Sequence, residues 1–497
     1  TRGSSGRTIW SPTCNSWTLG LRANWREADM TSSLSLTGRQ HAELRRHLFS
    51  GDGAESVAFA LCGQRVGSRR TRLLVQKLFL LPYEACDVRT PTAVSWSTDL
   101  IASLLDEADR KGLSVVKFHS HPGGFRRFSE QDDDSDAALF PSIAGWIEAN
   151  VPHASVVMLP TGELFGRTVS AEGSFAPLQS ISIVGEQLLI WRPELDGKSV
   201  SAPEFTKRHA AAYGERTIRL LRGLSIAIIG GSGTGSIVFE QLMRLGVGRI
   251  VVVDPDIVKD VNLNRILNTT IADVQAGASK ASILASAAGR VGLGTDVTPI
   301  AKYISDPEAI RAVAECDVVF GCVDSSEGRY LANRIAAFYV LPYFDVGVAL
   351  EADGAGMIDQ VCGYFHYIQP DLSSIVSRGA ISMEDVRAEG ERRRNEQHYR
   401  DLRRAGYINN VDETRPAVIS VNTVLSGLIV NEFLARLHDF RDEPGDQYAT
   451  VGFSLSQMAL YPEAESGVPC RLFARHVGRG DTDLLLDMPE FSEGEVR

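Results

Sequence analysis

The chain has 497 residues, a formal net charge of −11, 44% apolar residues and 23% charged residues. This length favours two or three domains, each with its own core, and the composition excludes a disordered or fibrous protein. The negative charge argues against nonspecific binding to nucleic acid or to anionic membranes, because both depend on clustered Lys and Arg.

Cysteine usage and the length of the apolar runs indicate a cytoplasmic protein. The seven cysteines form no C-x-x-C pair, and an odd, scattered set does not suggest a disulfide framework. The longest apolar runs, such as residues 224–229, fall far short of the roughly 20 residues that span a bilayer. We therefore expect no membrane association.

The first segment shows no periodicity and is rich in Ser, Arg and Trp up to Met30, the first methionine. We expect residues 1–35 to be a disordered or non-native extension. The sequence leaves the origin of residues 1–29 open, since their Arg content and early lack of acids also fit a transit peptide.

From about Leu36 the chain alternates short apolar runs with amphipathic segments, which predicts an α/β domain over residues 36–193. Strands are expected at residues 56–62, 72–80, 115–118 and 154–159, and helices at residues 99–111 and 137–149. The acidic stretch that ends at Asp136 is expected to be a loop.

A candidate zinc site follows the third of these strands. His119 and His121 are two residues apart, so an extended backbone directs both rings to the same side. Asp132 can complete three protein ligands and leave the fourth position to water, the arrangement of a catalytic zinc. Glu55 is the candidate general base, and Ser129 the candidate donor to the oxyanion.

The spacing His-x-His, seven residues, Ser, two residues, Asp, with an upstream Glu, resembles the JAMM (Mov34/MPN/PAD-1) metallopeptidases over about residues 36–185. The resemblance implies a zinc enzyme that cleaves peptide or isopeptide bonds at the C-terminus of ubiquitin-like proteins. The alternative is a surface His-x-His beside an acidic turn, residues 132–136, that binds no metal.

A breaker-rich stretch, residues 194–203, is the expected linker to a second domain at residues 204–485. A strand at residues 224–229, a glycine loop, a helix at 236–245 and a strand at 249–253 form a βαβ unit. The pattern predicts a Rossmann-like domain with a mainly parallel sheet.

The glycine loop contains Gly231, Gly233 and Gly235, where bare backbone at a helix N-terminus can hold a phosphate. Asp254 follows the second strand and can bind a ribose. Dehydrogenases share these features, so the loop alone does not identify the reaction.

A further set of residues favours adenylation over hydride transfer. Arg265 and Lys280 supply cations for a triphosphate, and Asp324, after a predicted strand, supplies an acid for magnesium. With Asn262, these residues resemble the ThiF/MoeB/HesA superfamily, which includes ubiquitin-activating enzymes, over about residues 204–437.

That resemblance implies ATP and Mg²⁺ as cofactors, with Asp254 at the ribose, Asn262, Arg265 and Lys280 at the phosphates, and Asp324 at the magnesium. Arg208 matches an arginine that reaches into the partner's site in dimeric members, which implies a homodimer through this domain.

The sequence departs from the family in its cysteines. Ser374 and Ser377 occupy the expected places of one zinc-binding pair and only Cys470 remains of the other, so we expect the structural zinc to be lost. No cysteine lies between residues 378 and 416. Transfer to a separate acceptor, a thioester on Cys362 and an ester on a hydroxyl such as Thr414 remain open.

Fusions of this kind resemble components of bacterial ubiquitin-like conjugation operons. The resemblance implies a bifunctional enzyme with a ubiquitin-like protein and a conjugating enzyme as partners. One alternative is sulfur-carrier activation for cofactor biosynthesis, and a second is a non-enzymatic scaffold, against which the intact residue sets argue. Coupling between the two sites is left open.

Overall fold

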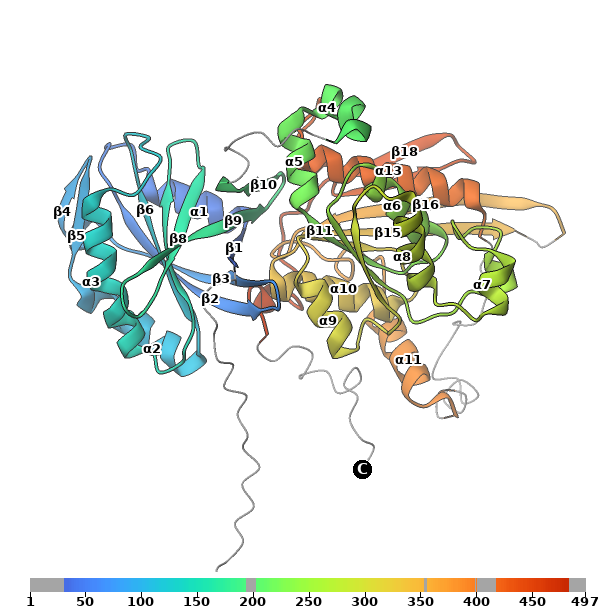
Figure 1. Ribbon diagram of the computed structural model, residues 1–497, viewed down its shortest axis with the longest axis horizontal. Coiled ribbons are helices and arrows are strands. Elements are labelled where there is room, and N and C mark those ends of the chain that lie inside the picture. Colours follow the sequence, from blue (N-terminus) through green and yellow to red (C-terminus); the bar gives the residue numbers. More distant parts are fainter. Residues whose placement is uncertain (1–30, 194–202, 353–354, 398, 400–416, 482–497) are drawn as a thin grey trace, which may run out of the picture. The chain divides into compact units, whose positions relative to one another are not determined.

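The computed structural model describes residues 31–193, 203–352, 355–397, 399 and 417–481 (Figure 1). Residues 1–29, Thr414 and all but one residue of the expected linker lie outside these ranges. The first described strand, β1 (Thr31–Thr37), begins ahead of Leu36, where the sequence pattern becomes regular.

The first sheet has eight strands in the order β1-β3-β2-β6-β7-β8-β9-β10, and β1 also pairs with β9. Helix α1 packs against β1, β2 and β3, whereas α2 and α3 pack together near β6, β7 and β8 (Figure 1). The other strands are β2 (Val57–Val66), β3 (Arg70–Leu80), β6 (Ser114–Ser120), β7 (His153–Met158), β8 (Leu164–Val169), β9 (Phe175–Val184) and β10 (Leu188–Trp191), with a separate hairpin of β4 (Cys86–Thr90) and β5 (Ala93–Trp96). The helices are α1 (Gly38–Leu48), α2 (Ala102–Lys111) and α3 (Glu130–Trp146).

Helix α3 begins earlier than the sequence pattern predicted. The acidic stretch expected to be a loop up to Asp136 forms the first two turns of this helix. Ser129 is the N-cap, and its side chain accepts a hydrogen bond from the Asp132 N–H while Asp132 accepts from the Ser129 N–H. This capping box, with acids in the first turn, stabilises a helix N-terminus without any apolar periodicity.

The second sheet also has eight strands, in the order β13-β12-β11-β14-β15-β16-β17-β18. Helices α6, α8 and α13 cover one face, and α9 and α10 the other. The strands are β11 (Ser225–Ile229), β12 (Arg249–Val253), β13 (Asp296–Ile300), β14 (Val318–Gly321), β15 (Tyr343–Ala352), β16 (Ile358–Ile368), β17 (Thr450–Ser454) and β18 (Ala459–Glu463). The helices are α4 (Lys207–Tyr213), α5 (Glu215–Gly223), α6 (Gly233–Arg244), α7 (Ile271–Gln275), α8 (Lys280–Val291), α9 (Pro307–Ala314), α10 (Ser326–Tyr339), α11 (Met383–Arg394) and α13 (Ile419–Leu437).

The strand order reverses at β11, which has β12 on one side and β14 on the other, both parallel to it. In open α/β sheets ligands bind at such a switch point, beyond the carboxyl ends of the strands. The loops after β11 and β14 therefore mark the expected crevice. The mixed α/β fold class expected from the sequence is confirmed.

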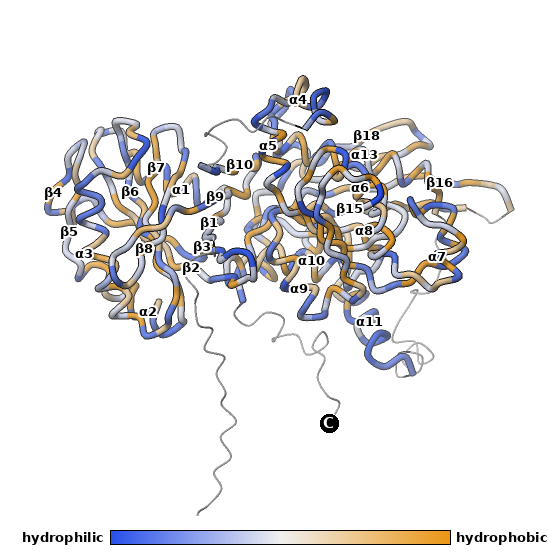
Figure 2. Tube along the Cα trace, in the orientation of Figure 1, coloured by the Kyte–Doolittle hydropathy of each residue, from blue (hydrophilic) through white to orange (hydrophobic). Residues whose placement is uncertain are grey.

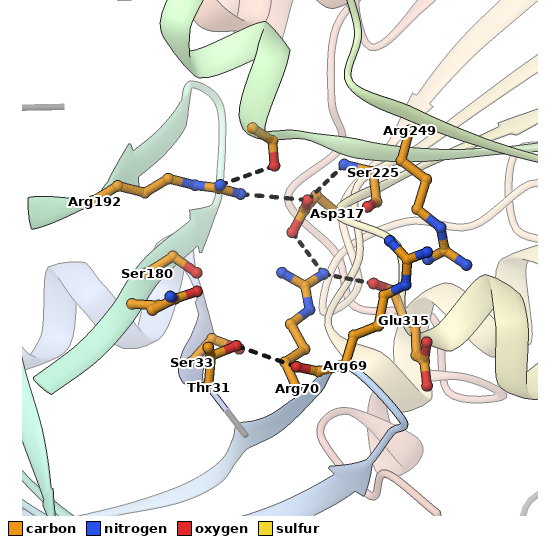
Figure 3. A pocket seen from close by; sticks show the side chains of 12 residues that line it. Thr31, Ser33, Arg69, Arg70, Ser180, Arg192, Ser225, Arg249, Glu315 and Asp317 are labelled. Carbon is orange, nitrogen blue, oxygen red and sulfur yellow. Dashed lines mark hydrogen bonds and ion pairs between the residues drawn. The ribbon is translucent and has the colours of Figure 1, made fainter. Parts of the chain in front are cut away.

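A buried ionic cluster joins the start of β3 to the start of β14. Asp317 lies within salt-bridge distance of Arg70 (2.8 Å), Arg72 (3.4 Å) and Arg192 (3.5 Å). It also accepts a hydrogen bond from the Ser225 N–H at 2.9 Å, and Figure 3 shows Arg70, Arg192 and Ser225 directed at its carboxylate. Arginines from the first sheet domain thus meet an acid of the second.

Residue hydropathy differs between elements, and Figure 2 shows α11 as hydrophilic along its length. No helix in the described ranges combines the length and the apolar character needed to cross a bilayer.

Candidate functional site

The first group of predicted site residues meets at one end of β6. His119 pairs with Val57 across β2 and β6, so Glu55, two residues before Val57, lies at the same end of the sheet. The Ser56 N–H donates to the Ser120 hydroxyl at 3.0 Å, which holds the segment that carries Glu55 against the end of β6.

The three expected zinc ligands converge. Ligand atoms of His119, His121 and Asp132 all lie within 4.8 Å of one another, and the two Nε2 atoms are 3.1 Å apart. The Asp132 carboxylate reaches both rings, at 3.0 Å from His119 Nε2 and 3.4 Å from His121 Nε2. Their distances from one another suit a tetrahedral zinc bound by nitrogen and oxygen.

The donor set suits a metal, although burial of His121 is outweighed by hydrogen bonds with Asp132 and Phe125, which raise the pKa of this ring. His121 Nδ1 lies 2.8 Å from the Phe125 carbonyl oxygen, so the neutral ring carries its proton there and presents a lone pair at Nε2. Burial opposes charge on His119 and lowers its pKa. Despite burial, hydrogen bonds with the two histidines and Ser129 hold the pKa of Asp132 well below its usual range. These residues therefore fit zinc.

Glu55 has the properties of a proton acceptor. Its residue is 8% exposed, and burial raises its pKa to about 7, although His121 opposes the shift. A carboxyl group with a pKa near neutrality can accept and release a proton at working pH. Ser129 donates to Asp132 Oδ2 at 2.7 Å in this structure, and its expected oxyanion role remains a prediction.

Sequence reasoning missed a buried network that supports α3, the helix that carries Asp132. Asp136 has no exposed surface and bonds Lys117 of β6 and Arg167 of β8. The Arg167 guanidinium also pairs with Asp133 and lies 3.7 Å from the centre of the Phe128 ring. These contacts fix the first turns of α3 relative to β6, the strand that carries His119.

The second group of predicted residues surrounds the loop after β11. A methyl group at Gly235 would lie 1.8 Å from the Gly230 carbonyl oxygen, so only glycine fits there. Helix α6 begins at Gly233, three residues before the expected start, because Ser232 is already its N-cap. That cap makes no side-chain hydrogen bond, which leaves the N–H groups of the helix N-terminus for a ligand.

Asp254 binds the backbone of this loop. Its Oδ2 accepts from the Gly231 N–H at 2.7 Å and its Oδ1 from the Asp256 N–H at 2.9 Å. Burial raises the pKa of Asp254, and Lys280 opposes the shift from 4.0 Å. Lys280 also pairs with Asp256 at 2.6 Å, so a bound phosphate must compete for its ammonium group.

Of the remaining predicted residues, Arg265 contacts the same loop. The aliphatic part of Arg265 packs against Gly233, with Cδ 3.2 Å from the position of a methyl group added there. Asn262 is buried and accepts from the Lys259 N–H at 3.0 Å. Asp324 is exposed just after β14. Arg208 is exposed on α4, outside the loop cluster, and its role across a dimer remains a prediction.

Asn422 lies beside the glycine loop, although the sequence did not indicate it. It lies on α13, near the C-terminal end of the domain, and is 4% exposed. Its Nδ2 is 2.4 Å from the position of a methyl group added at Gly233. Only the packing of α13 along α6 brings it there, so no local motif could have found it.

The serines expected to replace zinc ligands lie in a polar network. Ser374 and Ser377 bond each other through side chains and backbone. Arg378 donates to Glu465 at 2.7 Å and to the Ser373 hydroxyl at 2.8 Å. These bonds connect the segment after β16 to the segment after β18, near Cys470.

Cys362, one of the acceptors left open by the sequence, lies on β16 opposite Ala349 of β15. Burial and the nearby Glu351 raise its pKa, which works against a thiolate nucleophile.

Known proteins match both halves of the chain. Residues 206–465, more than half of it, match the ThiF family, and residues 38–168 match the prokaryotic homologs of the JAB domain. These matches confirm the organisation expected from the motifs, an N-terminal JAB domain followed by a ThiF domain.

Curated relatives include the ubiquitin-like modifier-activating enzyme 5 of Culex quinquefasciatus, which is 29% identical over 30% of this chain and 38% of its own length. The adenylyltransferase and sulfurtransferase UBA4 of Yarrowia lipolytica is 29% identical over 27% and 33%. The SAMP-activating enzyme E1 of Haloferax volcanii is 30% identical over 24% and 43%. The chain thus aligns with less than half of each relative. Among solved structures, E. coli MccB with ATP is 18% identical over 56% of this chain and 75% of that chain, with a TM-score of 0.39.

Proposed function

The chain belongs to the ThiF family, and on this premise we propose that it activates the C-terminus of a ubiquitin-like protein with ATP. We further propose that its JAB domain processes or deconjugates the same ubiquitin-like protein. The observation that carries the adenylation half is the convergence of Gly233, Asp254, Lys280 and Arg265 around one loop at the switch point of the sheet. The names of the relatives, which include activating enzymes for ubiquitin-like modifiers, support the choice of substrate.

In the proposed reaction a carboxylate oxygen of the C-terminus attacks the α-phosphorus of ATP. A new P–O bond forms, the bond to the β-phosphate breaks, and pyrophosphate leaves with the electron pair. Arg265 and Lys280 offset the charge on the phosphates, and Asp324 is the acid for Mg²⁺. The exposed position of Asp324 beyond β14 suits a hydrated magnesium ion.

In the peptidase half His119, His121 and Asp132 would hold zinc, which supplies a polarised carbonyl and an acidified water when it is bound. Glu55 would take the proton from the attacking water and pass it to the leaving amine, a role that its raised pKa favours.

Sulfur-carrier activation is the second candidate, because UBA4 is by name both an adenylyltransferase and a sulfurtransferase. A sulfurtransferase partner would favour it, and a conjugating enzyme would favour protein modification. The non-enzymatic scaffold is disfavoured by the intact ligand sets. Homodimerisation through Arg208 and a cytoplasmic location remain predictions.

The adenylation proposal is tested by exchange of labelled pyrophosphate into ATP with ubiquitin-like proteins that end in a free C-terminus. We expect exchange that requires this C-terminus and is abolished by Asp324→Ala. Wild-type chain that neither binds ATP nor supports exchange with any such protein would refute the proposal.

A further inference from the structure

The side chain of Asn422 reaches the N-terminus of α6 from a helix almost 190 residues further along the chain. Its Nδ2 lies where it would contact a methyl group at Gly233, at 2.4 Å, and the Arg265 stem packs on the same glycine. The Ser426 hydroxyl donates to the Thr234 carbonyl at 3.2 Å, which fixes α13 against the first turn of α6.

The side-chain amide of Asn422 makes no hydrogen bond within the part of the chain that the structure describes. The residue as a whole is 4% exposed, whereas its amide atoms are not fully enclosed. An accessible carboxamide without a protein partner can donate a hydrogen bond to a bound ligand. Asn431, on the same helix, is exposed and donates to the Gly427 carbonyl at 2.8 Å.

The helix N-terminus beside this amide also lacks its usual partner. The N-cap Ser232 of α6 makes no side-chain hydrogen bond, whereas α3, α8 and α10 are capped by Ser129, Ser279 and Ser325. Uncapped N–H groups and the helix dipole favour an anion at this position. The Arg265 stem packs there, while its guanidinium donates to the Val261 carbonyl and to Asn264. A carboxamide N–H adds a directed neutral donor to the same place.

We propose that Asn422 binds the reacting centre of the adenylation reaction by donating its Nδ2–H to an anionic oxygen at the N-terminus of α6. This oxygen belongs to the α-phosphate of ATP or to the carboxylate that attacks it, and the two share the chemistry that the amide recognises. The inference rests on the proposed adenylation.

The test compares Asn422→Asp with Asn422→Ala, because Asp keeps the shape of the side chain and replaces the donor with a negative charge. We expect Asn422→Ala to weaken Mg-ATP binding, or to raise the KM for the ubiquitin-like protein, roughly 10- to 100-fold, as for loss of a hydrogen bond to a charged group. We expect a larger effect from Asn422→Asp, because its negative charge repels the anionic oxygen. If Asn422 only fills space, the isosteric Asp is the milder change. Asn431→Asp is the matched control on the same helix.

Two readouts identify which oxygen is bound. Equilibrium binding of Mg-ATP without a protein substrate reports the α-phosphate, and the KM for the ubiquitin-like protein in pyrophosphate exchange reports the carboxylate. The proposal predicts weaker binding of Mg-ATP, a higher KM for the ubiquitin-like protein, or both. The effect should be larger for Asn422→Asp than for Asn422→Ala, and Asn431→Asp should behave like wild type. The proposal is overturned if Asn422→Asp matches Asn431→Asp in both readouts, or if Ala is the more damaging change. Wild type inactive in both readouts would instead contradict the proposed adenylation.

Discussion

The acid at the centre of the buried ionic cluster offers a sharp test of what holds the JAB and ThiF domains together. Asp317→Asn keeps the volume of the side chain and removes its charge. The side chain of Arg72 is 3% exposed and that of Asp317 is 5% exposed, so water cannot replace the lost charge at Arg72. Arg70 and Arg192 lose the same partner.

Two physical arguments set the size of the expected effect. Burial alone would raise the pKa of Asp317, but Arg70, Arg192 and Arg72 outweigh it and lower the pKa to about 2. A shift of about two units corresponds to about 2 to 3 kcal/mol in favour of the ionised form. Removing one partner of a buried ion pair typically costs about 3 to 5 kcal/mol. We therefore expect Asp317→Asn to lower the free energy of unfolding by about 3 kcal/mol or more.

Urea unfolding followed by circular dichroism measures this change, with Asp296→Asn as the control. Asp296 pairs with Arg69, but their side chains are 53% and 57% exposed, so its loss should cost less than about 1 kcal/mol. The folded-state pKa of Asp317 is depressed, so its contribution exists above pH 4 and disappears as the pH falls toward 2. The difference between wild type and Asp317→Asn should shrink over that range. A loss under 1 kcal/mol at pH 7 would refute the reasoning.

Two further predictions concern the JAB domain. Glu55→Gln should lower the rate of cleavage of a ubiquitin-like fusion protein by roughly 100-fold or more, because Glu55 transfers a proton. Its zinc affinity should stay within about threefold of wild type, because Glu55 is not a ligand. The control is the exposed Glu130→Gln, and an equal loss of cleavage in this variant would argue against the role of Glu55. Arg167→Gln should lower zinc affinity roughly 10- to 100-fold, measured by competition with a chromophoric chelator, because Arg167 supports the helix that carries Asp132. The exposed Arg110→Gln is its control, and unchanged affinity in Arg167→Gln would show that α3 does not need this support.

The sequence predicted the zinc-ligand set and the glycine loop because each is local. His119, His121 and Asp132 lie within 14 residues, and strand alternation followed by a capped helix is enough to bring them together. The glycine loop is equally local, since Gly235 must approach Gly230 wherever a strand turns directly into a helix.

What the sequence did not predict depends on contacts between distant segments. The start of α3 was misplaced because a capping box, rather than apolar periodicity, begins that helix. Asn422 reaches Gly233 only through the packing of α13 on α6. Asp317 and the arginines of β3 are separated by about 245 residues, and charge alone does not reveal which surface groups pair in the fold.

The central claim, two separate activities on one chain, is tested most directly by measuring exchange and cleavage in the same preparations of wild type, Asp324→Ala and His121→Ala. The account predicts that Asp324→Ala loses pyrophosphate exchange and keeps zinc-dependent cleavage, whereas His121→Ala loses cleavage and keeps exchange. If either variant lost both activities while circular dichroism showed an intact fold, the two sites would not be independent. Absence of pyrophosphate exchange in wild type would contradict the proposed adenylation itself.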